Sequence, residues 1–406
     1  MRVGFYFGRN VASGDSSGGA NTFRSSLLNA MKSYQGRCKY YVFSEDYSSD
    51  EFDTKFIKID TGLGFENECF FKKQLLRIPR KIKRMNLETK YKNALNRAAV
   101  EHKIDLMWFI TPAFEVVEVP FVYTVWDLEH RCQSFFPEVS VTAWKYDDRE
   151  KRYCYAIPRA AYVVIGNQAG KDEVIKFYGV PEQRVKIIPL PAPEFALKDQ
   201  SDLSVNLSVY NLPDKFLFYP AQVWPHKNHI VILLALKILK EKFEIKMHAV
   251  FTGSDKGNLS FVQQKVAELN LVDQVHFLNV VPFNVLSELY KKAFALVFPS
   301  FFGPDNIPPL EAFGLGCPVI AASVNGSAFQ LGDAAILFDP KNENELADAI
   351  FKLINYEELR KMLILRGKER VKFFTIDKYL QSVTNLIDEF ELVRRCWAPG
   401  SEYTAK

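Results

Sequence analysis

The sequence lacks the long apolar run, the paired cysteines and the strong net charge that characterise membrane-spanning, zinc-finger and nucleic-acid-binding proteins. No stretch approaches the ~20 apolar residues that a helix needs to cross a bilayer, and a buried strand explains the N-terminal MRVGFYFGRN better than a signal peptide does. None of the six cysteines forms a Cys-x-x-Cys pair and no histidine lies at zinc-finger spacing, which favours reduced thiols in a cytoplasmic protein. The net charge of +4 is too small to indicate nucleic acid as a partner.

The length and the hydrophobic pattern predict an α/β protein with two domains. At 406 residues the chain exceeds what one hydrophobic core usually supports. Short apolar runs alternate with helix-like stretches in two series: RVGFYFG, YYVFS, DLMWFI, FVYTVWD and AYVVIGN, then FLFYPA, KMHAVFTG, VHFLN, ALVFPS, PVIAAS and AAILFD. This alternation predicts two Rossmann-like, doubly wound parallel sheets that face a cleft, with ligands bound at the carboxyl ends of the strands.

A stretch rich in Pro, Ser and Asp, from Pro189 to Asp214, has no clear period and separates the two series. We therefore expect a first domain over residues 1–195, a linker over 196–213 and a second domain over 214–375. The remaining residues, 376–406, are expected to form a C-terminal helix that packs back on the first domain.

The loop after the predicted strand ALVFPS combines backbone-shaping residues with a lone glutamate. It reads PSFFGPDNIPPLEAFGLGCPVIAA from Pro299 to Ala322. Pro308 and Pro309 can start a helix, which would put Glu311 in its first turn at the edge of the cleft. Free amides there attract anions, and a carboxylate can accept two hydrogen bonds from a vicinal diol, so the loop suits the phosphate and ribose of a nucleotide. The alternative is that Glu311 only complements the helix dipole.

The motif NIPPLEAFGLGCPVIAA, followed by GDAAILFDP, resembles the retaining glycosyltransferases of family four, which have the two-Rossmann-domain GT-B architecture. The resemblance implies that Glu311 holds the ribose of a nucleotide sugar. In FYPAQVWPHKNH, Lys227 matches the lysine that contacts the donor phosphate. The donor diphosphate is further expected to contact the glycine-rich GGANTF segment and the loop before the helix, through Gly18, Gly19, Asn306 and Ile307.

The sequence departs from the family pattern at positions that usually contact the donor or its sugar. Gly303 stands where the family has its first glutamate, and Ala221-Gln222 replaces the usual Gly-Arg pair before the lysine. Trp126 replaces the usual histidine in WDL. The form FGP-x-N-x-PPLE resembles a surface-polysaccharide branch of the family, so Gly303 is expected to mark a subfamily. Gly303 and Gln222 are still expected to lie at the donor.

The resemblance implies transfer of a hexose with retention to a glycan or lipid-linked acceptor, in surface polysaccharide or lipopolysaccharide O-antigen biosynthesis. Lys227 would stabilise the leaving diphosphate. No Asp-x-Asp motif is present, so neither a metal nor another cofactor is expected. GDP-mannose is the donor we expect, ahead of UDP- or dTDP-sugars. Two other functions stay open: a GT-B nucleotide-sugar epimerase, and a non-catalytic module that binds nucleotide sugars or glycans.

Two further groups of charged residues have two interpretations each. Asp127 and His130, in TVWDLEHR, are catalytic candidates that could orient an acceptor hydroxyl, or they belong to a loop salt-bridge group. The tract FFKKQLLRIPRKIKRM has interleaved apolar and basic residues and suits an anionic membrane surface or a phosphate-rich acceptor. We expect peripheral attachment to the inner face of the plasma membrane through its basic side chains, among them Lys72, Lys73, Arg77, Arg80 and Lys81.

Overall fold

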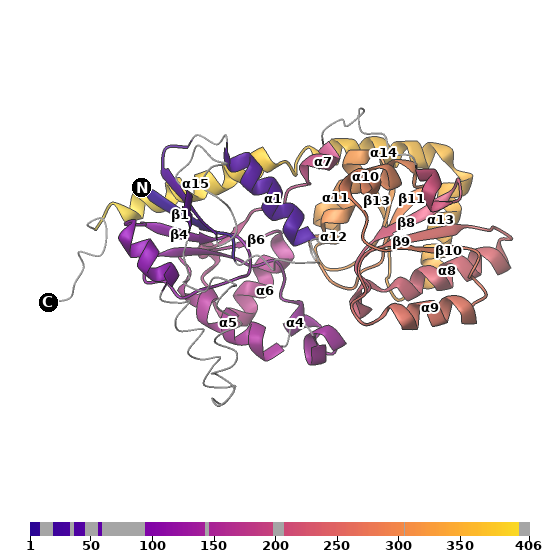
Figure 1. The fold of residues 1–406 in the computed structure, drawn as a ribbon, viewed down its shortest axis with the longest axis horizontal. Helices are drawn as coiled ribbons and strands as arrows, with labels where there is room; N and C mark the ends of the chain where they lie inside the picture. Colours follow the sequence, from indigo (N-terminus) through magenta and orange to yellow (C-terminus); the bar gives the residue numbers. More distant parts are fainter. Residues whose placement is uncertain are drawn as a thin grey trace, which may run out of the picture.

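The computed structural model describes residues 1–8, 19–32, 36–44, 56–58, 94–142, 146–197, 207–303 and 305–397. Two α/β domains lie side by side, each built on a parallel sheet (Figure 1). The strand orders are β3-β2-β1-β4-β5-β6-β7 in the first domain and β10-β9-β8-β11-β12-β13 in the second. The predicted fold class, with two doubly wound parallel sheets, is confirmed.

The first sheet contains strands whose central members are buried on both faces, as parallel sheets require. Its strands are β1 (Arg2–Tyr6), β2 (Lys39–Ser44), β3 (Phe56–Lys58), β4 (Leu106–Phe109), β5 (Phe121–Thr124), β6 (Tyr162–Ile165) and β7 (Val185–Ile187). Its helices include α1 (Gly19–Lys32), a helix over 94–101, α4 (Glu129–Cys132), α5 (Tyr146–Arg159) and α6 (Gln168–Tyr178). A π-helical turn, η4 (Glu138–Thr142), follows α4, and a 3-10 turn, η5 (Glu182–Arg184), precedes β7.

Short helical pieces connect the domains: α7 (Glu194–Leu197) and the 3-10 turn η7 (Leu207–Tyr210). The second sheet contains β8 (Phe216–Pro220), β9 (His248–Thr252), β10 (Val275–Leu278), β11 (Ala295–Phe298), β12 (Val319–Ala322) and β13 (Ala335–Phe338). Its helical elements are η8 (Pro225–Lys227), α8 (His229–Lys242), α9 (Leu259–Glu268), α10 (Phe283–Lys292), α11 (Ile307–Leu315), α12 (Ser327–Leu331), α13 (Glu343–Asn355) and α14 (Glu357–Val371).

The last helix, α15 (Ile376–Arg394), leaves the second domain and lies beside α1 of the first (Figure 1). Its apolar face, including Leu380, Val383 and Leu386, joins the hydrophobic cluster that covers one face of the first sheet. Near its end, Arg394 forms an ion pair with Asp105 at 2.6 Å. The chain therefore crosses between the domains a second time, and α15 contributes to the core of the first.

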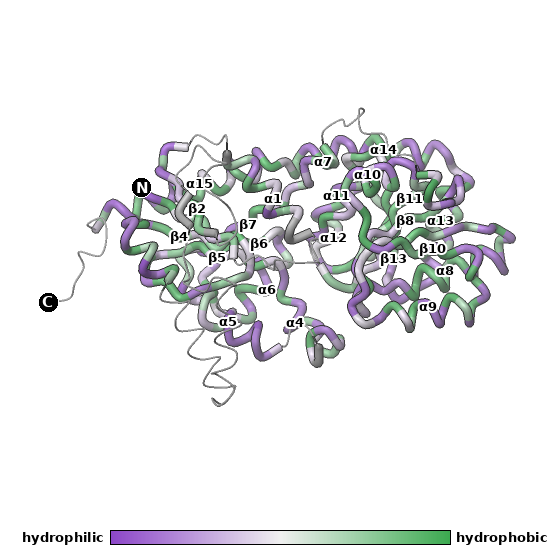
Figure 2. Tube along the Cα trace, in the orientation of Figure 1, coloured by the Kyte–Doolittle hydropathy of each residue, from purple (hydrophilic) through white to green (hydrophobic). Residues whose placement is uncertain are grey.

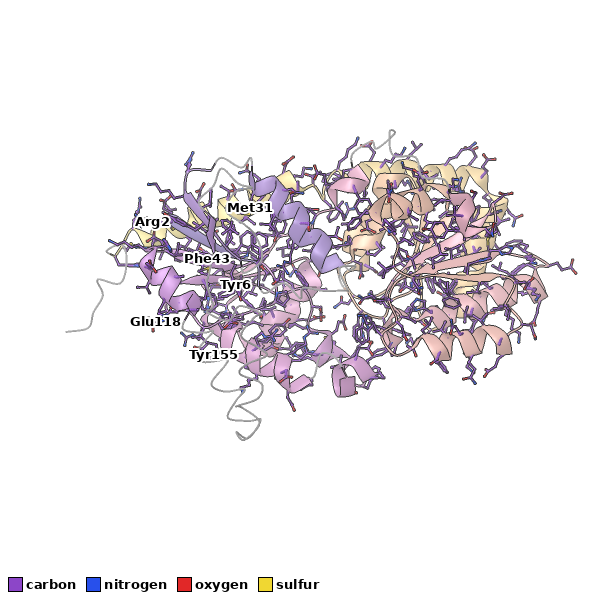
Figure 3. The ribbon with its side chains drawn as sticks, in the orientation of Figure 1. Arg2, Tyr6, Met31, Phe43, Glu118 and Tyr155 are labelled. Atoms are coloured by element: carbon purple, nitrogen blue, oxygen red, sulfur yellow. The ribbon has the colours of Figure 1, made fainter. Side chains whose placement is uncertain are left out.

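Side chains of the first sheet alternate between two apolar clusters. Phe5 belongs with Met31 of α1 to the cluster that α15 joins, whereas Tyr6 and its cross-strand neighbour Phe43 belong to the opposite one. Figure 3 labels Tyr6, Met31 and Phe43 at these places. In Figure 2 the hydrophobic colour follows the strands inside each domain, and helices such as α9 alternate between hydrophobic and hydrophilic residues. Among the described helices, none combines the length and the apolar composition needed to cross a membrane.

Candidate active site

Lys227 ends the 3-10 turn η8, which follows β8 at the carboxyl edge of the second sheet. The turn is fixed from two sides. The hydroxyl of Tyr219 donates to the carbonyl oxygen of Lys227 at 2.7 Å, and the side-chain amide of Asn228 donates to the carbonyl oxygen of Pro340 at 2.7 Å. Asn228 has a left-handed backbone with φ 54°, which lets α8 start directly after the turn. Nζ of Lys227 lies 5.4 Å from the centre of the Phe298 ring.

Burial lowers the pKa of Lys227 to about 8, against the opposing effect of three carboxylates, Asp127, Glu138 and Glu129. All three belong to the first domain. Within the described ranges, no carboxylate forms an ion pair with Lys227. Lys227 is therefore mostly a cation at neutral pH and can attract an anionic ligand.

Glu311 lies on α11, but deeper than the sequence predicted. The helix begins at Ile307, one residue before Pro308, so Glu311 is its fifth residue and the first turn has no acidic side chain. The expected first-turn position is therefore wrong. Glu311 is only 6% exposed, and its Oε2 accepts a hydrogen bond of 2.6 Å from the hydroxyl of Tyr290. Burial raises the pKa of Glu311 to about 7, although the bond from Tyr290 opposes the shift.

Residues of the loop before α11 form hydrogen bonds and apolar contacts with other parts of the protein. The backbone N–H of Asn306 donates to Oε1 of Gln330 at 3.0 Å, so in this arrangement it is not available to a phosphate, contrary to expectation. Ile307 is buried and contributes to the core of the first domain. Gly303 has φ 99°, and a Cβ there would lie 2.3 Å from Oδ1 of Asn306, which explains the absence of a larger residue. Gln222 accepts a hydrogen bond of 3.0 Å from the indole N–H of Trp224.

The structure supports the salt-bridge interpretation of Asp127 and His130. Asp127 pairs with Arg149 at 2.8 Å; burial alone would raise the pKa of this carboxyl, but Arg149 holds it below its usual range. His130 is fully buried, with Nε2 3.1 Å from Oε2 of Glu150, and burial lowers its pKa to about 4. A side chain with no exposed surface cannot orient an acceptor hydroxyl, so the catalytic role expected for His130 is not retained.

Glu129 of the first domain contacts the loop that precedes α11. Its Oε1 lies 3.4 Å from the backbone N–H of Gly303, and its Oε2 accepts 2.9 Å from the side-chain amide of Gln133. Burial and the neighbouring Asp127 raise the pKa of Glu129 to about 7. In the other direction, Asp305 of the second domain accepts 3.0 Å from the backbone N–H of Leu190.

Sequence reasoning did not identify Glu138, Asp305 or Glu129 as contacts between the domains. Glu138 is fully buried in the first domain and accepts 3.0 Å from the backbone N–H of His226 in the second. The partners are separated by 88, 115 and 174 residues respectively. A local sequence pattern cannot predict contacts between residues so far apart in the chain.

A cavity of about 700 Å³ opens where the domains meet. It is lined by α4 and α6 of the first domain and by the loops after β11, β12 and β13 of the second; its charged residues are Glu129, Glu173, Asp339, Lys341 and Glu345. In the described part of the chain, no group of three or more His, Cys, Asp or Glu residues is arranged to hold a metal ion.

The structure gives less information about the other predicted site residues. Gly19 is the first residue of α1, while Gly18 and the basic residues Lys72, Lys73, Arg77, Arg80 and Lys81 lie outside the described residues. Trp126 is partly buried beside Phe23, with ring centres 6.4 Å apart, and its indole N–H is buried with no hydrogen-bond partner in the described part of the chain.

Lys227 and Glu311 thus follow β8 and β11, which are hydrogen-bonded neighbours in the second sheet. A cation and a buried carboxylate at adjacent strand ends suit a ligand that carries both phosphate and hydroxyl groups. Residues 207–370 match the family model of the glycosyl transferases, group 1. The matched segment contains both Lys227 and Glu311.

The chain is also similar to two curated bacterial proteins. It is 30% identical over 211 residues to the O-antigen chain mannosyltransferase RfbU of Salmonella typhimurium, covering 50% of this chain and 56% of the relative. It is 22% identical over 246 residues to the O-antigen chain mannosyltransferase B of Escherichia coli, covering 60% and 64%. The chain thus spans less than two thirds of the length of either relative.

Two solved structures show the same fold. Sucrose-phosphate synthase from Thermosynechococcus elongatus superposes with a TM-score of 0.70 at 18% identity, over 97% of this chain and all of that one. Anabaena HepE, in complex with UDP and glucose, superposes with a TM-score of 0.69 at 17% identity, over 96% and 100%. The architecture is therefore the GT-B fold, with two α/β domains each built on a parallel sheet.

Proposed function

We propose that this protein is a glycosyltransferase that moves a hexose from a nucleotide-diphosphate donor to a glycan or lipid-linked acceptor with retention. The observation that carries the proposal is the position of Lys227 and Glu311. Both lie within the segment that matches the group 1 glycosyl transferases, and both follow adjacent strands at the edge where doubly wound sheets bind ligands.

In the proposed reaction, Glu311 binds the ribose diol and Lys227 binds the diphosphate. The bond between C1 of the sugar and the phosphate oxygen breaks, and the acceptor oxygen bonds to C1 on the same face. The acceptor proton passes to the leaving phosphate, so no protein base is required. Lys227 stabilises the charge that develops on the phosphate, and the cleft positions the substrates and excludes water. We propose that no metal takes part.

The names of the relatives favour mannose as the transferred sugar. Two of the relatives described above are O-antigen mannosyltransferases, and a third is the serotype-specific mannosyltransferase WbdA of Escherichia coli, 24% identical over 211 residues. We therefore propose GDP-mannose as donor and an O-antigen or related surface-polysaccharide intermediate as acceptor.

Incubation with GDP-mannose, UDP-glucose, UDP-galactose and dTDP-rhamnose, with and without lipid-linked oligosaccharide, tests the proposal. We expect release of GDP that depends on acceptor, together with a product heavier by one hexose. An isomerised donor without transfer would indicate an epimerase. Binding of a nucleotide sugar with no turnover of any donor would indicate a non-catalytic module.

We also propose that the basic tract over residues 70–85 attaches the enzyme to the cytoplasmic face of an anionic membrane. Each basic residue near such a surface contributes ~1 kcal/mol. Liposomes with anionic lipid should co-sediment with the protein at low salt and release it at high salt, and neutral liposomes should not retain it.

Replacing Lys72, Lys73, Arg80 and Lys81 with Gln should abolish sedimentation without weakening donor binding. A matched control replaces four lysines on helices and loops of the second domain, Lys237, Lys246, Lys265 and Lys291, and should sediment as wild type does. If wild-type protein does not co-sediment with anionic liposomes at low salt, the membrane proposal is wrong.

A further inference from the structure

Glu138 is a fully buried carboxylate that the proposed reaction does not use. It is the first residue of the π-helical turn η4, a rare backbone form that is frequent at functional sites. Its Oε1 accepts the backbone N–H of His226 at 3.0 Å and also contacts Nδ1 of the same histidine. Its Oε2 is buried with no hydrogen-bond partner among the described residues. A charged group is costly to bury unless it is paired and hydrogen-bonded, so the contacts that Glu138 does make are informative.

Both contacts of Glu138 reach across the domain boundary to the turn that carries Lys227. A carboxylate can only accept, so Nδ1 of His226 is the protonated nitrogen, and burial lowers the pKa of this histidine to about 4, which keeps the ring neutral. The ring stacks on Phe302 with centres 4.2 Å apart, and the carbonyl oxygen of His226 accepts from the N–H of Phe301 at 2.9 Å. His226 is thus held from both domains, directly before Lys227.

The charges around Lys227 single out Glu138. Asp127 has the largest effect in keeping Lys227 protonated, but its charge is also paired with Arg149 at 2.8 Å, and Glu129 has a pKa of about 7, so it is only partly ionised at neutral pH. Glu138 is different: burial opposes its ionisation, but the bonds from His226 hold its pKa below the usual range, and its bonded partner is neutral. His229, also close to Lys227, is neutral because burial lowers its pKa to about 3.

We propose that Glu138 is the positioning residue of Lys227: it fixes the Pro225–Lys227 turn across the domain boundary and supplies the uncompensated negative charge that keeps the ammonium protonated before the diphosphate binds. This inference rests on the proposed function, in which Lys227 binds the donor diphosphate. Without Glu138, burial would favour the neutral amine of Lys227. The diphosphate would then bind only after Lys227 had taken up a proton.

The test is the pH dependence of nucleoside diphosphate binding, measured with GDP and with UDP by calorimetry between pH 7 and 10. Wild-type affinity should fall as the pH rises past about 8, where free Lys227 loses its proton. In Glu138→Gln the fall should begin about one pH unit lower, the small end of the shift that a nearby opposite charge causes. This change keeps the size of the side chain and an acceptor for the N–H of His226.

Glu150→Gln is the matched control. Glu150 is a carboxylate of the first domain that is partly buried, but it pairs with Arg131 and is not among the groups that shift the pKa of Lys227. Its binding profile should follow that of the wild type. The same profile in Glu138→Gln as in the wild type would overturn the inference.

His226→Gln separates the charge of Glu138 from its contact with the His226 ring, which helps to fix the turn. This variant also provides the test if Glu138→Gln does not fold. The backbone N–H of residue 226 still donates to the Glu138 carboxylate in this variant, so the charge remains and the fall in affinity should keep its wild-type pH. Affinity should drop about tenfold across the whole range because the contacts of the imidazole ring with Glu138 and Phe302 are lost. Wild-type affinity in His226→Gln would contradict the positioning role. Wild-type protein that binds neither GDP nor UDP at any pH would instead refute the proposed function.

Discussion

At the scale of single residues, Lys227 is expected to act on the transition state more than on binding. Removing one group that stabilises developing charge typically lowers the rate ~10²–10³-fold. Lys227→Ala should therefore lower kcat by about that factor and raise the donor KM much less, as steady-state kinetics would show. Lys240→Ala, on the exposed side of the following helix α8, is the control and should behave as wild type. An unchanged kcat in Lys227→Ala would exclude it as the cation on the leaving group.

Glu311 should make the free protein less stable as the pH rises. Because burial raises its pKa to about 7 from an ordinary 4.5, protonated Glu311 contributes stability that is fully present below about pH 4.5 and is lost as the pH rises through 7. Glu311→Gln, which can still accept the bond from Tyr290, should match the wild type at pH 5 and exceed it at pH 8.5 by up to about 3 kcal/mol. Urea unfolding at the two pH values measures this difference.

The same variant should bind the donor roughly tenfold more weakly at pH 8, because a hydrogen bond to a charged acceptor is stronger than one to an amide. A Glu311→Gln protein that is stabler but binds donor normally would leave the pKa argument intact and remove Glu311 from the ribose site.

Sequence patterns located the chemistry of single residues better than their surroundings. Lys227 and Glu311 could be placed at strand ends because the apolar runs before them are local signals. Burial of His130 could not be predicted, because it depends on Glu150 and Tyr178 from α5 and α6, which the fold brings to it. Glu138 could not be found for the same reason: its partner lies 88 residues away in the other domain.

At the scale of elements, every apolar run that was predicted to be a strand is one. The two strands that no such run predicted, β3 and β7, have three residues each and form the two edges of the first sheet. An edge strand has one neighbour, so it needs less buried surface and leaves a weaker pattern. The start of α11 was missed by one residue because Ile307, which precedes the two prolines, is held in the first domain's core.

The loop between β11 and α11 meets the loop after β6 so closely that a methyl group cannot be added. A Cβ on Gly166 would lie 2.0 Å from Oδ2 of Asp305, the oxygen that accepts from the N–H of Leu190. Gly166→Ala should therefore displace the 303–306 loop and weaken donor binding, which a titration with nucleotide sugar would measure. The double variant Gly166→Ala, Asp305→Ala should bind more tightly than Gly166→Ala alone, because the two shortest contacts, with Oδ2 and Cγ of Asp305 at 2.0 and 2.8 Å, are gone. Normal binding in the single variant would show that the loop yields without consequence.

At the scale of the whole molecule, both domains determine the electrostatic surroundings of the candidate site. The cation and the buried carboxylate belong to the second domain, but Asp127, Glu129 and Glu138, which set the charge around Lys227, belong to the first. Contacts cross the boundary in both directions, from Glu129 to Gly303 and from Asp305 to Leu190. A change in the spacing of the domains would therefore alter both the shape of the cleft and the protonation of Lys227.

The stability of the first domain should depend on a helix that follows the second in sequence. Leu386 of α15 is 5% exposed and packs in the cluster on the first sheet, where Tyr379 of the same helix stacks on Trp108 with ring centres 6.0 Å apart. Leu386→Ala should cost ~2–5 kcal/mol, because it leaves a cavity in that cluster. Leu392→Ala, 59% exposed on the same helix, should stay within about 0.5 kcal/mol of the wild type.

Hydrogen exchange in moderate urea would assign the loss to a domain. Peptides from β1 and β4 should lose protection in Leu386→Ala, while those from β8 and β11 should keep it, because their cluster contains no residue of α15. Equal loss of protection in both sheets would mean that the two domains unfold as one unit. In that case α15 would stabilise the whole molecule and not the first domain alone. Wild-type protection everywhere would show that α15 is not part of that core in solution.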